Sequence, residues 1–318
     1  MDAANLPDCW KAKTDPSAMD PNTAFPLEGR DILNIPQAEL ISAAETAPTL
    51  HDLQNNRVSR ITRDLVIKSH SYTLPSEANA MKLVAEKTSI RIPKVHRSFF
   101  VSQTHGLYKS RGYIVMDYID GLSLDKCWEI LPQSIRDDII EQVADMIAQL
   151  QSLQLPTPGP LGGGPSQGNW FTPYGAGPFT GPLDLENFFN QRLEMAKSFS
   201  RVSKSIPPFD LANSKFALTH LDIAPRNLVL DSGGKVWLID WANSGAYPPM
   251  LEIATLVVER ERCKDFYEPL LQRVTRDQDA VEQFMSGQTV QEIPAFDHIT
   301  RIETWATTRS LSPPNNTD

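Results

Sequence analysis

One stretch constrains the fold of this chain more than any other. Two short apolar runs, residues 228–230 and 236–239, flank an Asp-Ser-Gly-Gly tetrad that is typical of a tight turn. The pattern predicts a β-hairpin, with Asp222 and Asn227 just before its first strand and Asp240 at the end of its second. Because a hairpin brings these ends together, we expect the three polar side chains to lie close to one another.

These side chains have the chemistry that phosphoryl transfer needs. One carboxylate can receive a hydroxyl proton, while an Asn and a second carboxylate can hold Mg²⁺. The spacing is H-x-D-x-x-x-x-N followed by an Asp, as in the catalytic loop of kinases. Asp240 is followed by Trp-Ala and not by Phe-Gly, so the chain resembles the aminoglycoside phosphotransferase (APH) and choline kinase group. Within that group it is similar to the fungal APH-like phosphotransferases of unassigned substrate.

The resemblance implies an α+β, two-lobed protein-kinase-like fold. A small antiparallel-sheet lobe with one helix is expected beside a larger, mostly helical lobe that carries the catalytic hairpin. We expect an N-terminal extension over residues 1–50, a nucleotide-binding N-lobe over residues 51–118, and a C-lobe with the acceptor pocket over residues 119–318. The extension is expected to be partly helical and to pack on the N-lobe.

A lysine and a glutamate in the N-lobe form a candidate pair. Residues 65–68 have the pattern of a strand, and by itself Lys68 at its end is either a solvated charge or a functional one. An amphipathic helix follows, with Ser76 as its expected N-cap and Glu77 on its inner stripe. A Glu on an inner stripe needs a partner, and Lys68 can supply it.

The resemblance implies a role for each of these residues in using ATP and Mg²⁺. Asp222 would be the general base, or orienting carboxylate, for the acceptor hydroxyl, and Asn227 and Asp240 would hold Mg²⁺ on the β- and γ-phosphates. Lys68, fixed by Glu77, would bind the α- and β-phosphates.

Other positions are implied to have supporting roles. Residues 112–117 read as a strand that leads into the interlobe hinge, where the carbonyl of Asp117 and the amide of Ile119 would bond adenine. His220 is expected to be structural, through hydrogen bonds to backbone.

Two features depart from the commonest family form. No glycine occurs between Gly29 and Gly106, so the Gly-rich phosphate-covering loop of protein kinases is absent, and the candidate turn is at residues 54–56. The usual His-Gly-Asp has Leu221 at its centre, and Ala224 stands where a His or Lys is often found. A cationic side chain near the γ-phosphate is therefore missing.

The expected C-lobe is built from helices around one long loop. Helices are predicted over residues 132–155, 185–199 and about 250–274, and the Pro- and Gly-rich residues 156–182 are expected to form a functional loop at the mouth of the cleft. Several acidic side chains after Met250 either favour a cationic acceptor or are solvated helix faces: Glu252, Glu259, Glu261 and Asp265.

Composition narrows the class of protein and of partner. The 318 residues are 41% hydrophobic and 22% charged, which is typical of a soluble globular protein. The net charge of −9 argues against a nucleic-acid or membrane partner. Cys9, Cys127 and Cys263 suggest neither a disulfide framework nor a zinc site. With no export signal and no apolar run of membrane-spanning length, a cytoplasmic protein is expected.

We therefore expect an ATP-dependent kinase that acts on a small-molecule hydroxyl. The alternatives are a pseudokinase that binds nucleotide or a partner and, less favoured, a protein kinase. The turn after Asp240 runs almost directly through Pro248-Pro249 into a helix, which leaves no room for the activation segment of a protein kinase. A metal-dependent hydrolase is disfavoured because the six histidines form no H-x-x-x-H or H-x-H pair.

Overall fold

The described part of the chain forms two compact units. Among the described residues, unit 1 lies within 23–150 and 223–242, and unit 2 lies within 151–222 and 243–275. The computed structural model describes residues 23–53, 56–70, 75–102, 110–171, 175–200, 204–205, 207–211 and 213–275. The expected division of the chain at residues 50 and 118 stays a prediction.

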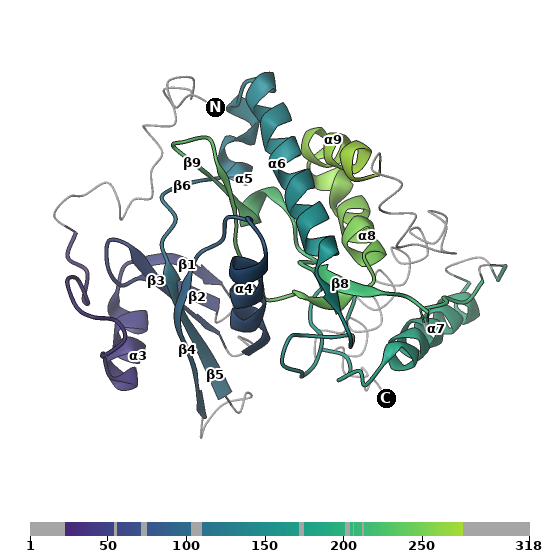
Figure 1. The fold of residues 1–318 in the computed structure, drawn as a ribbon, viewed down its shortest axis with the longest axis horizontal. Coiled ribbons are helices and arrows are strands. Elements are labelled where there is room, and N and C mark those ends of the chain that lie inside the picture. Colours follow the sequence, from purple (N-terminus) through teal and green to yellow (C-terminus); the bar gives the residue numbers. More distant parts are fainter. Residues whose placement is uncertain are drawn as a thin grey trace, which may run out of the picture. The chain divides into compact units, whose positions relative to one another are not determined.

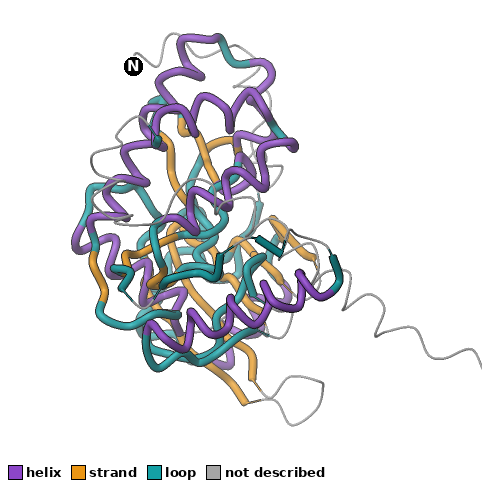
Figure 2. The backbone as a smooth tube through the Cα atoms, turned by 90° about the vertical axis from the view of Figure 1, so that its right-hand side faces the viewer, coloured by secondary structure: helices purple, strands orange, loops and turns teal. Residues whose placement is uncertain are grey.

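An antiparallel sheet of five strands forms the centre of unit 1, in the order β1-β2-β3-β5-β4 (Figure 1; strands in orange in Figure 2). Its strands are β1 Thr49–Leu53, β2 Asn56–Arg60, β3 Leu65–His70, β4 Val95–Ser102 and β5 Ser110–Asp117. Because side chains alternate along a strand, Ile67 and Ser69 of β3 point to one face and Lys68 points to the other. The predicted strand at residues 65–68 is confirmed.

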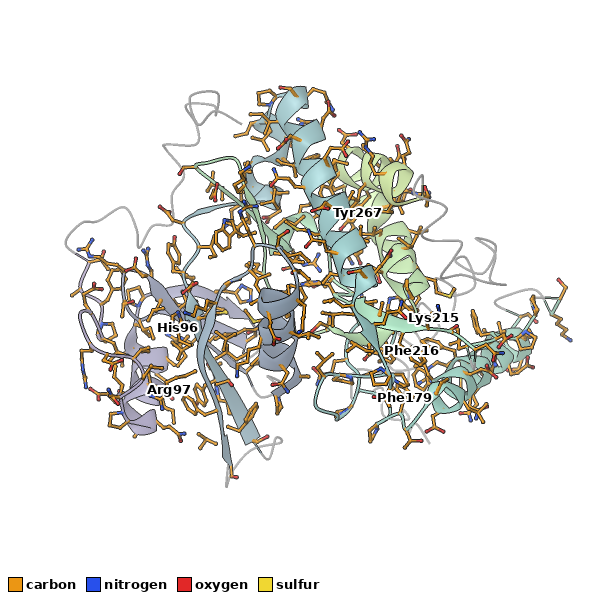
Figure 3. All side chains as sticks on the ribbon, viewed as in Figure 1. His96, Arg97, Phe179, Lys215, Phe216 and Tyr267 are labelled. Carbon is orange, nitrogen blue, oxygen red and sulfur yellow. The ribbon has the colours of Figure 1, made fainter. Side chains whose placement is uncertain are left out.

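Helix α3 (Gln37–Thr46) packs on the face of the sheet to which Ile67 points. Its Leu40 and Ala43 belong to a buried apolar cluster with Ile67 and Tyr113. The guanidinium of Arg97 on β4 donates to the backbone carbonyls before this helix (Figure 3). The expected packing of a helical extension on the sheet is confirmed for residues 37–46, while residues 1–22 lie outside the described part.

Helix α4 (Pro75–Lys87) contributes Met81 and Val84 to the core of unit 1, and Glu77 is buried beside them. The amphipathic helix is therefore confirmed. The prediction that Ser76 caps it is wrong, because the helix begins at Pro75 and Ser76 lies inside its first turn. Proline suits a first helical turn, where no partner is available for a backbone N–H.

The predicted hairpin is present in unit 1. Strands β9 (Leu228–Asp231) and β10 (Val236–Leu238) pair antiparallel, and β6 (Gly121–Ser123) adds a third strand to them. A carboxylate oxygen of Asp231 accepts the backbone N–H groups of Gly233 and Lys235 at 2.8 and 2.9 Å. This side-chain acceptor closes the turn, as Asp commonly does at such positions.

Helix α6 (Gln133–Ser152) holds the hairpin in place. Gln142 accepts the N–H of Val236 and donates to the carbonyl of Gly234, both at 3.0 Å. The helix predicted over residues 132–155 is confirmed over residues 133–152, and residues 154–155 form a strand instead. Its buried apolar side chains include Ile135, Ile139, Val143, Met146 and Leu150. The short helices α5 (Leu124–Cys127) and η2 (Trp128–Ile130) precede it.

Unit 2 contains a three-stranded sheet and several helices. Strand β8 (Phe216–Thr219) lies between β7 (Gln154–Leu155) and β11 (Gly245–Tyr247). Its helices are α7 Pro182–Ser198, α8 Met250–Glu259, η4 Arg260–Arg262 and α9 Lys264–Val274. Among the described residues, no helix is long and apolar enough to cross a membrane.

The Pro- and Gly-rich residues 156–182 contain no helix before Pro182 in their described part, as predicted, and aromatic side chains anchor them to unit 2. Trp170 donates to the hydroxyl of Thr255 on α8 at 2.7 Å. The ring of Phe171 contacts Tyr247 and also Phe179, which is labelled in Figure 3. The segment is thus tied to β11 and α8 by buried rings.

We expect Leu40→Ala to destabilise the protein by about 3 kcal/mol, because it removes a fully buried side chain between α3 and the sheet. Leu33→Ala is the matched control, since Leu33 is 64% exposed, and it should change stability by less than about 0.5 kcal/mol. Urea denaturation followed by circular dichroism measures both. Equal, small effects would contradict the packing of α3 on the sheet.

Candidate active site

A buried lysine lies between two carboxylates in unit 1. Lys68 Nζ donates to Glu77 Oε1 at 2.7 Å and to Asp240 Oδ1 at 2.6 Å. Lys68 is 4% exposed and Glu77 is 2% exposed, whereas the Asp240 side chain is 36% exposed. The predicted Lys68–Glu77 pair is present, and the hairpin supplies a second carboxylate to the same ammonium group.

The two neighbouring carboxylates favour the protonated, positively charged form of Lys68. Burial by itself lowers the pKa of Lys68, but the charges of Asp240 and Glu77 outweigh it and raise the pKa above its ordinary value. Burial raises the pKa of Glu77, an effect that the positive charge of Lys68 opposes. The accessible charge of the cluster is therefore the carboxylate of Asp240, which attracts cations.

The hairpin also brings Asn227 and Asp240 to one end. Asn227 closes the short helix η3 (Pro225–Asn227), directly before β9, and its carbonyl accepts the N–H of Ile239 at 3.0 Å. Asp240 is the next residue, and its backbone is left-handed with φ of 63°. The two residues named as metal ligands are therefore neighbours across the hairpin, as expected from the sequence.

Within the described ranges, no group of three or more His, Cys, Asp or Glu side chains is placed to hold a metal ion. A Mg²⁺ ion bound with a nucleotide takes most of its ligands from phosphate oxygens and water and needs only one or two from the protein. The amide oxygen of Asn227 and the carboxylate of Asp240 have the right chemistry for such an ion.

Asp117 and Ile119 lie where β5 ends. Asp117 pairs with Leu65 in the sheet, three residues along β3 from Lys68, which corresponds to about 10 Å. The Asp117 carboxylate accepts from His96 at 2.7 Å and from the Lys94 N–H at 3.0 Å (His96 is labelled in Figure 3). Its side chain is engaged in holding β4, so only its backbone is suited to a ligand.

Asp222 belongs to unit 2, in the segment that follows β8. It is half-buried and directly precedes Ile223, the first residue of the unit 1 segment that carries Asn227. The residues that unit 1 brings together are thus Lys68, Glu77, Asn227 and Asp240.

A buried glutamate on α8 positions the backbone before Asp222. Glu252 Oε2 accepts the N–H of His220 at 2.5 Å, and the Leu221 N–H lies 3.1 and 3.2 Å from its two oxygens. Leu221 is left-handed with φ of 59°, a conformation that glycine adopts without strain. The carboxylate of Glu252 thus stabilises the strained turn that presents Asp222.

The role of Glu252 was missed at the level of sequence, where it was either an acceptor-binding or a solvated acid. Both interpretations are wrong, because Glu252 is 2% exposed. Glu259 is also buried, and its carboxylate pairs with Arg262 at 2.9 Å. The signal that could have revealed this role is a single Glu among apolar residues in the first turn of a helix. Such a Glu is expected to be buried, and a buried carboxylate requires hydrogen-bond donors nearby.

Comparison with known proteins identifies the class. The sequence matches the APH phosphotransferase enzyme family over residues 46–284. The chain therefore belongs to this family, although nothing narrows it to a fungal branch. None of the curated proteins matched the sequence.

Solved structures with the same fold are aminoglycoside phosphotransferases. A mutant of the 2'-phosphotransferase IIIa in its GDP complex is 14% identical, with 82% of this chain and 85% of that chain covered and a TM-score of 0.53. A mutant of APH(4)-Ia with ADP and hygromycin B is also 14% identical, with 85% and 91% covered and a TM-score of 0.49. ADP-bound APH(2'')-Ib is 12% identical, with 85% and 86% covered and a TM-score of 0.48. The first of these structures, with its TM-score above 0.5, confirms the kinase-like fold expected from the sequence.

We expect Glu252→Gln to change how stability depends on pH. Burial raises the pKa of the Glu252 carboxyl from 4.5 to about 7, while the two backbone N–H groups lower it and Asp222 raises it. Between about pH 4.5 and 7 the native protein holds a proton that the unfolded chain has lost. The stabilisation from this group is therefore complete below that window and is lost as the pH rises through it.

The free energy of unfolding of wild type minus that of Glu252→Gln should fall across this window and then level off. Urea denaturation at several pH values measures the difference. Glu268→Gln, at an exposed position on α9, is the control for removing a solvated carboxyl. A difference that does not vary with pH would contradict the raised pKa of Glu252.

Proposed function

We propose that this protein is an ATP- and Mg²⁺-dependent phosphotransferase that moves the γ-phosphate to a hydroxyl of a small molecule. The observation that carries the proposal is the buried Lys68, in contact with Glu77 from α4 and with Asp240 from the hairpin. The chain's membership of a phosphotransferase family supports a role for this cluster in phosphoryl transfer. A lysine fixed by a glutamate is the group that kinases use to bind the α- and β-phosphates.

The nucleotide would lie along β3 and β5 of unit 1. Lys68 would bind its phosphates, and the backbone of Asp117 and Ile119 would hydrogen-bond the adenine. The spacing of about 10 Å between Lys68 and the end of β5 supports this arrangement, because base and phosphates of one nucleotide are a comparable distance apart. Candidate turn residues 54 and 55 lie outside the described part.

Asn227 and Asp240 would hold the metal ion. When bound, Mg²⁺ neutralises charge on the β- and γ-phosphates. The partial exposure of Asp240 supports this role, since its carboxylate is accessible while Lys68 beneath it is not. Glu77 would act only by orienting Lys68.

Asp222 would accept the proton of the acceptor hydroxyl, a role that contributes roughly 10²–10⁴-fold to the rate. This role is supported by the hydrogen bonds from the backbone N–H groups of His220 and Leu221 to the Glu252 carboxylate, which fix the backbone directly before Asp222. Ala224 is buried and apolar, so no cation from that position would assist the γ-phosphate.

The short connection after Asp240 favours a small-molecule acceptor over a protein side chain. Strand β11 begins at Gly245 and α8 begins at Met250. A protein kinase places a long activation segment there, on which the substrate peptide lies. The short connection supports an acceptor that enters a pocket, whereas the second candidate, a pseudokinase, would bind nucleotide without transfer.

The first test is nucleotide binding. Mg·ATP at 100 times its dissociation constant should stabilise the protein by about 2.7 kcal/mol, measured as a thermal shift. Lys68→Met should abolish the shift, whereas Lys82→Met, at an exposed position of α4, should not. Asp240→Asn should weaken its metal-dependent part.

Because one structure with this fold is a GDP complex, Mg·GTP should be measured beside Mg·ATP. A larger thermal shift with Mg·GTP than with Mg·ATP would replace adenine by guanine as the bound base and would leave the proposed nucleotide site unchanged. The absence of a shift with either nucleotide at millimolar concentration would contradict the nucleotide site itself.

The second test is transfer. With γ-labelled ATP, we expect label on at least one member of a pool of amino-alcohols, aminoglycosides and sugars, and none on a Ser/Thr/Tyr peptide library. Asp222→Asn should lower turnover by about 10²-fold or more and leave nucleotide binding nearly intact. Asp137→Asn, at an exposed position of α6, is the matched control.

Labelled peptides with no labelled small molecule would favour a protein kinase. Nucleotide binding without any transfer, and without background ATP hydrolysis that depends on Asp222, would favour the pseudokinase.

A further inference from the structure

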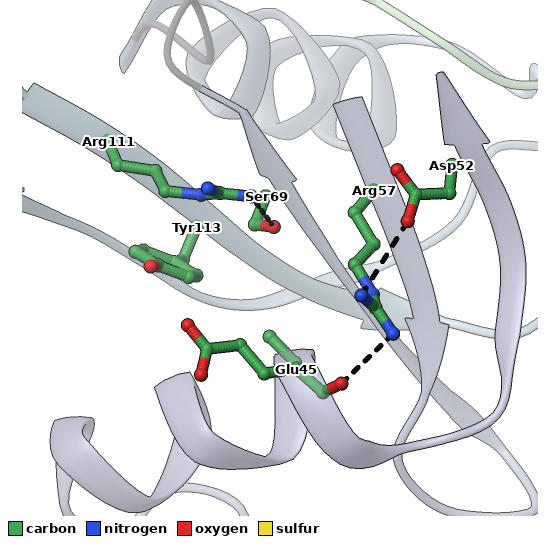
Figure 4. Close-up of a pocket in the computed structure, with 7 residues that line it drawn as sticks. Glu45, Asp52, Arg57, Ser69, Arg111 and Tyr113 are labelled. Atoms are coloured by element: carbon green, nitrogen blue, oxygen red, sulfur yellow. Dashed lines mark hydrogen bonds and ion pairs between the residues drawn. The ribbon is translucent and has the colours of Figure 1, made fainter. Parts of the chain in front are cut away.

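A polar cavity lies on the α3 face of the sheet in unit 1. Its volume is about 240 Å³. Its lining, drawn in Figure 4, comes from the end of α3 and from β1, β2, β3 and β5: Ala44, Glu45, Asp52, Arg57, Ser69, Arg111 and Tyr113.

This cavity is distinct from the Lys68 cluster. Ser69, which lines it, follows Lys68 directly on β3, and neighbouring residues of a strand point to opposite faces of the sheet. Tyr113 is paired with Ser69 and belongs to the core under α3. The cavity and the candidate nucleotide site therefore lie on opposite faces of one sheet.

One of its two arginines is engaged by the protein. Arg57 is 3.6 Å from the Asp52 carboxylate, and it donates to the Glu45 carbonyl at 3.0 Å and to the Thr49 hydroxyl at 2.7 Å. Figure 4 shows Arg57 between Asp52 and Glu45. Its charge is balanced by Asp52, so Arg57 forms a wall of the cavity.

The other arginine keeps unused donors. Arg111 donates from Nη2 to the Ser69 hydroxyl at 3.0 Å. Its Nε is buried and has no hydrogen-bond partner among the described residues. A buried N–H without an acceptor is unfavourable, and a ligand oxygen at this point would give it one.

An unbalanced negative charge faces the same space. The Glu45 side chain is exposed and makes no ion pair or side-chain hydrogen bond with another described residue. In Figure 4 its carboxylate lies on the other side of Tyr113 from the Arg111 guanidinium. Burial raises the pKa of the Tyr113 hydroxyl, Arg111 lowers it and Glu45 raises it, so both charges act on this hydroxyl.

We propose that this cavity binds a small zwitterion of the amino-acid class. Its carboxylate would accept from Arg111 and from the Tyr113 hydroxyl, and its ammonium group would donate to Glu45. A simple anion would leave Glu45 unbalanced, and a simple cation would leave the buried Nε of Arg111 without an acceptor. The volume is below the 300–1,000 Å³ or so of drug-sized ligand sites, so a nucleotide or an aminoglycoside is too large.

The test is calorimetric titration of the full chain at low salt. The probes are glycine, β-alanine and γ-aminobutyrate, whose charges are increasingly separated, with acetate and methylammonium as single-charge comparisons. We expect saturable binding of at least one of the three amino acids. Acetate and methylammonium should bind about tenfold or more weakly, because each satisfies only one of the two charged groups.

Two variants separate the groups. Arg111→Gln should weaken binding of the amino acid about tenfold or more, and Glu45→Gln should bring its affinity down to that of acetate. Arg91→Gln and Glu86→Gln, at exposed positions of the same unit, should change neither. Thermal unfolding of each variant checks that it is folded, and Glu45→Gln, at an exposed position, decides the matter if Arg111→Gln does not fold.

The proposal is overturned if none of the three amino acids binds saturably, if acetate binds as tightly as they do, or if neither variant changes their affinity. The result is independent of nucleotide binding and transfer, since the cavity shares no residue with the Lys68 cluster.

Discussion

The candidate nucleotide site of unit 1 depends on one buried ammonium group. Lys68 is removed from water and is balanced by Glu77 and Asp240, so a strand, a helix and the hairpin each contribute one charge. Loss of one partner from a buried pair typically costs about 3–5 kcal/mol, because it leaves an uncompensated charge. The position of α4 on the sheet and that of the hairpin against α6 are therefore linked to the same cluster. Gln142 fixes the hairpin, and α4 fixes the glutamate.

A second buried carboxylate organises the turn before Asp222. The commonest family form has glycine where this chain has Leu221, and the left-handed φ of 59° explains the family preference. A non-glycine residue in this conformation costs roughly 1–2 kcal/mol. Two features offset that cost here, since the Leu221 side chain is buried and its N–H is bonded to Glu252. The departure noted in the sequence thus leaves the turn in the conformation that a glycine would adopt.

Much of the fold could be predicted because its signals are local. The hairpin was evident from two apolar runs around an Asp-Ser-Gly-Gly turn, and the Lys68–Glu77 contact from a polar residue on each inner face. The prediction of a single helix over about residues 250–274 is wrong, since η4 separates α8 from α9, and the charged residues 259–262 interrupt the apolar pattern at that break. The burial of Glu252 could not be predicted, because it depends on how α8 packs against the residues after β8. The polar cavity on the α3 face of the sheet could not be predicted either, since its lining comes from α3 and from strands far apart in the sequence.

The distribution of backbone strain bears on whether this chain transfers phosphate or only binds nucleotide. Among the described residues, three that are not glycine have a positive φ, and two of these are Leu221 and Asp240. Strained residues persist where the surrounding structure holds them, and they gather at functional sites. A binding module could use the strained Asp240 for a metal ion. The strained Leu221, held by a buried Glu252, directly precedes Asp222, the residue proposed to act on the acceptor. The strain at Leu221 is thus consistent with the transferase proposed above, and Asp222→Asn tests it.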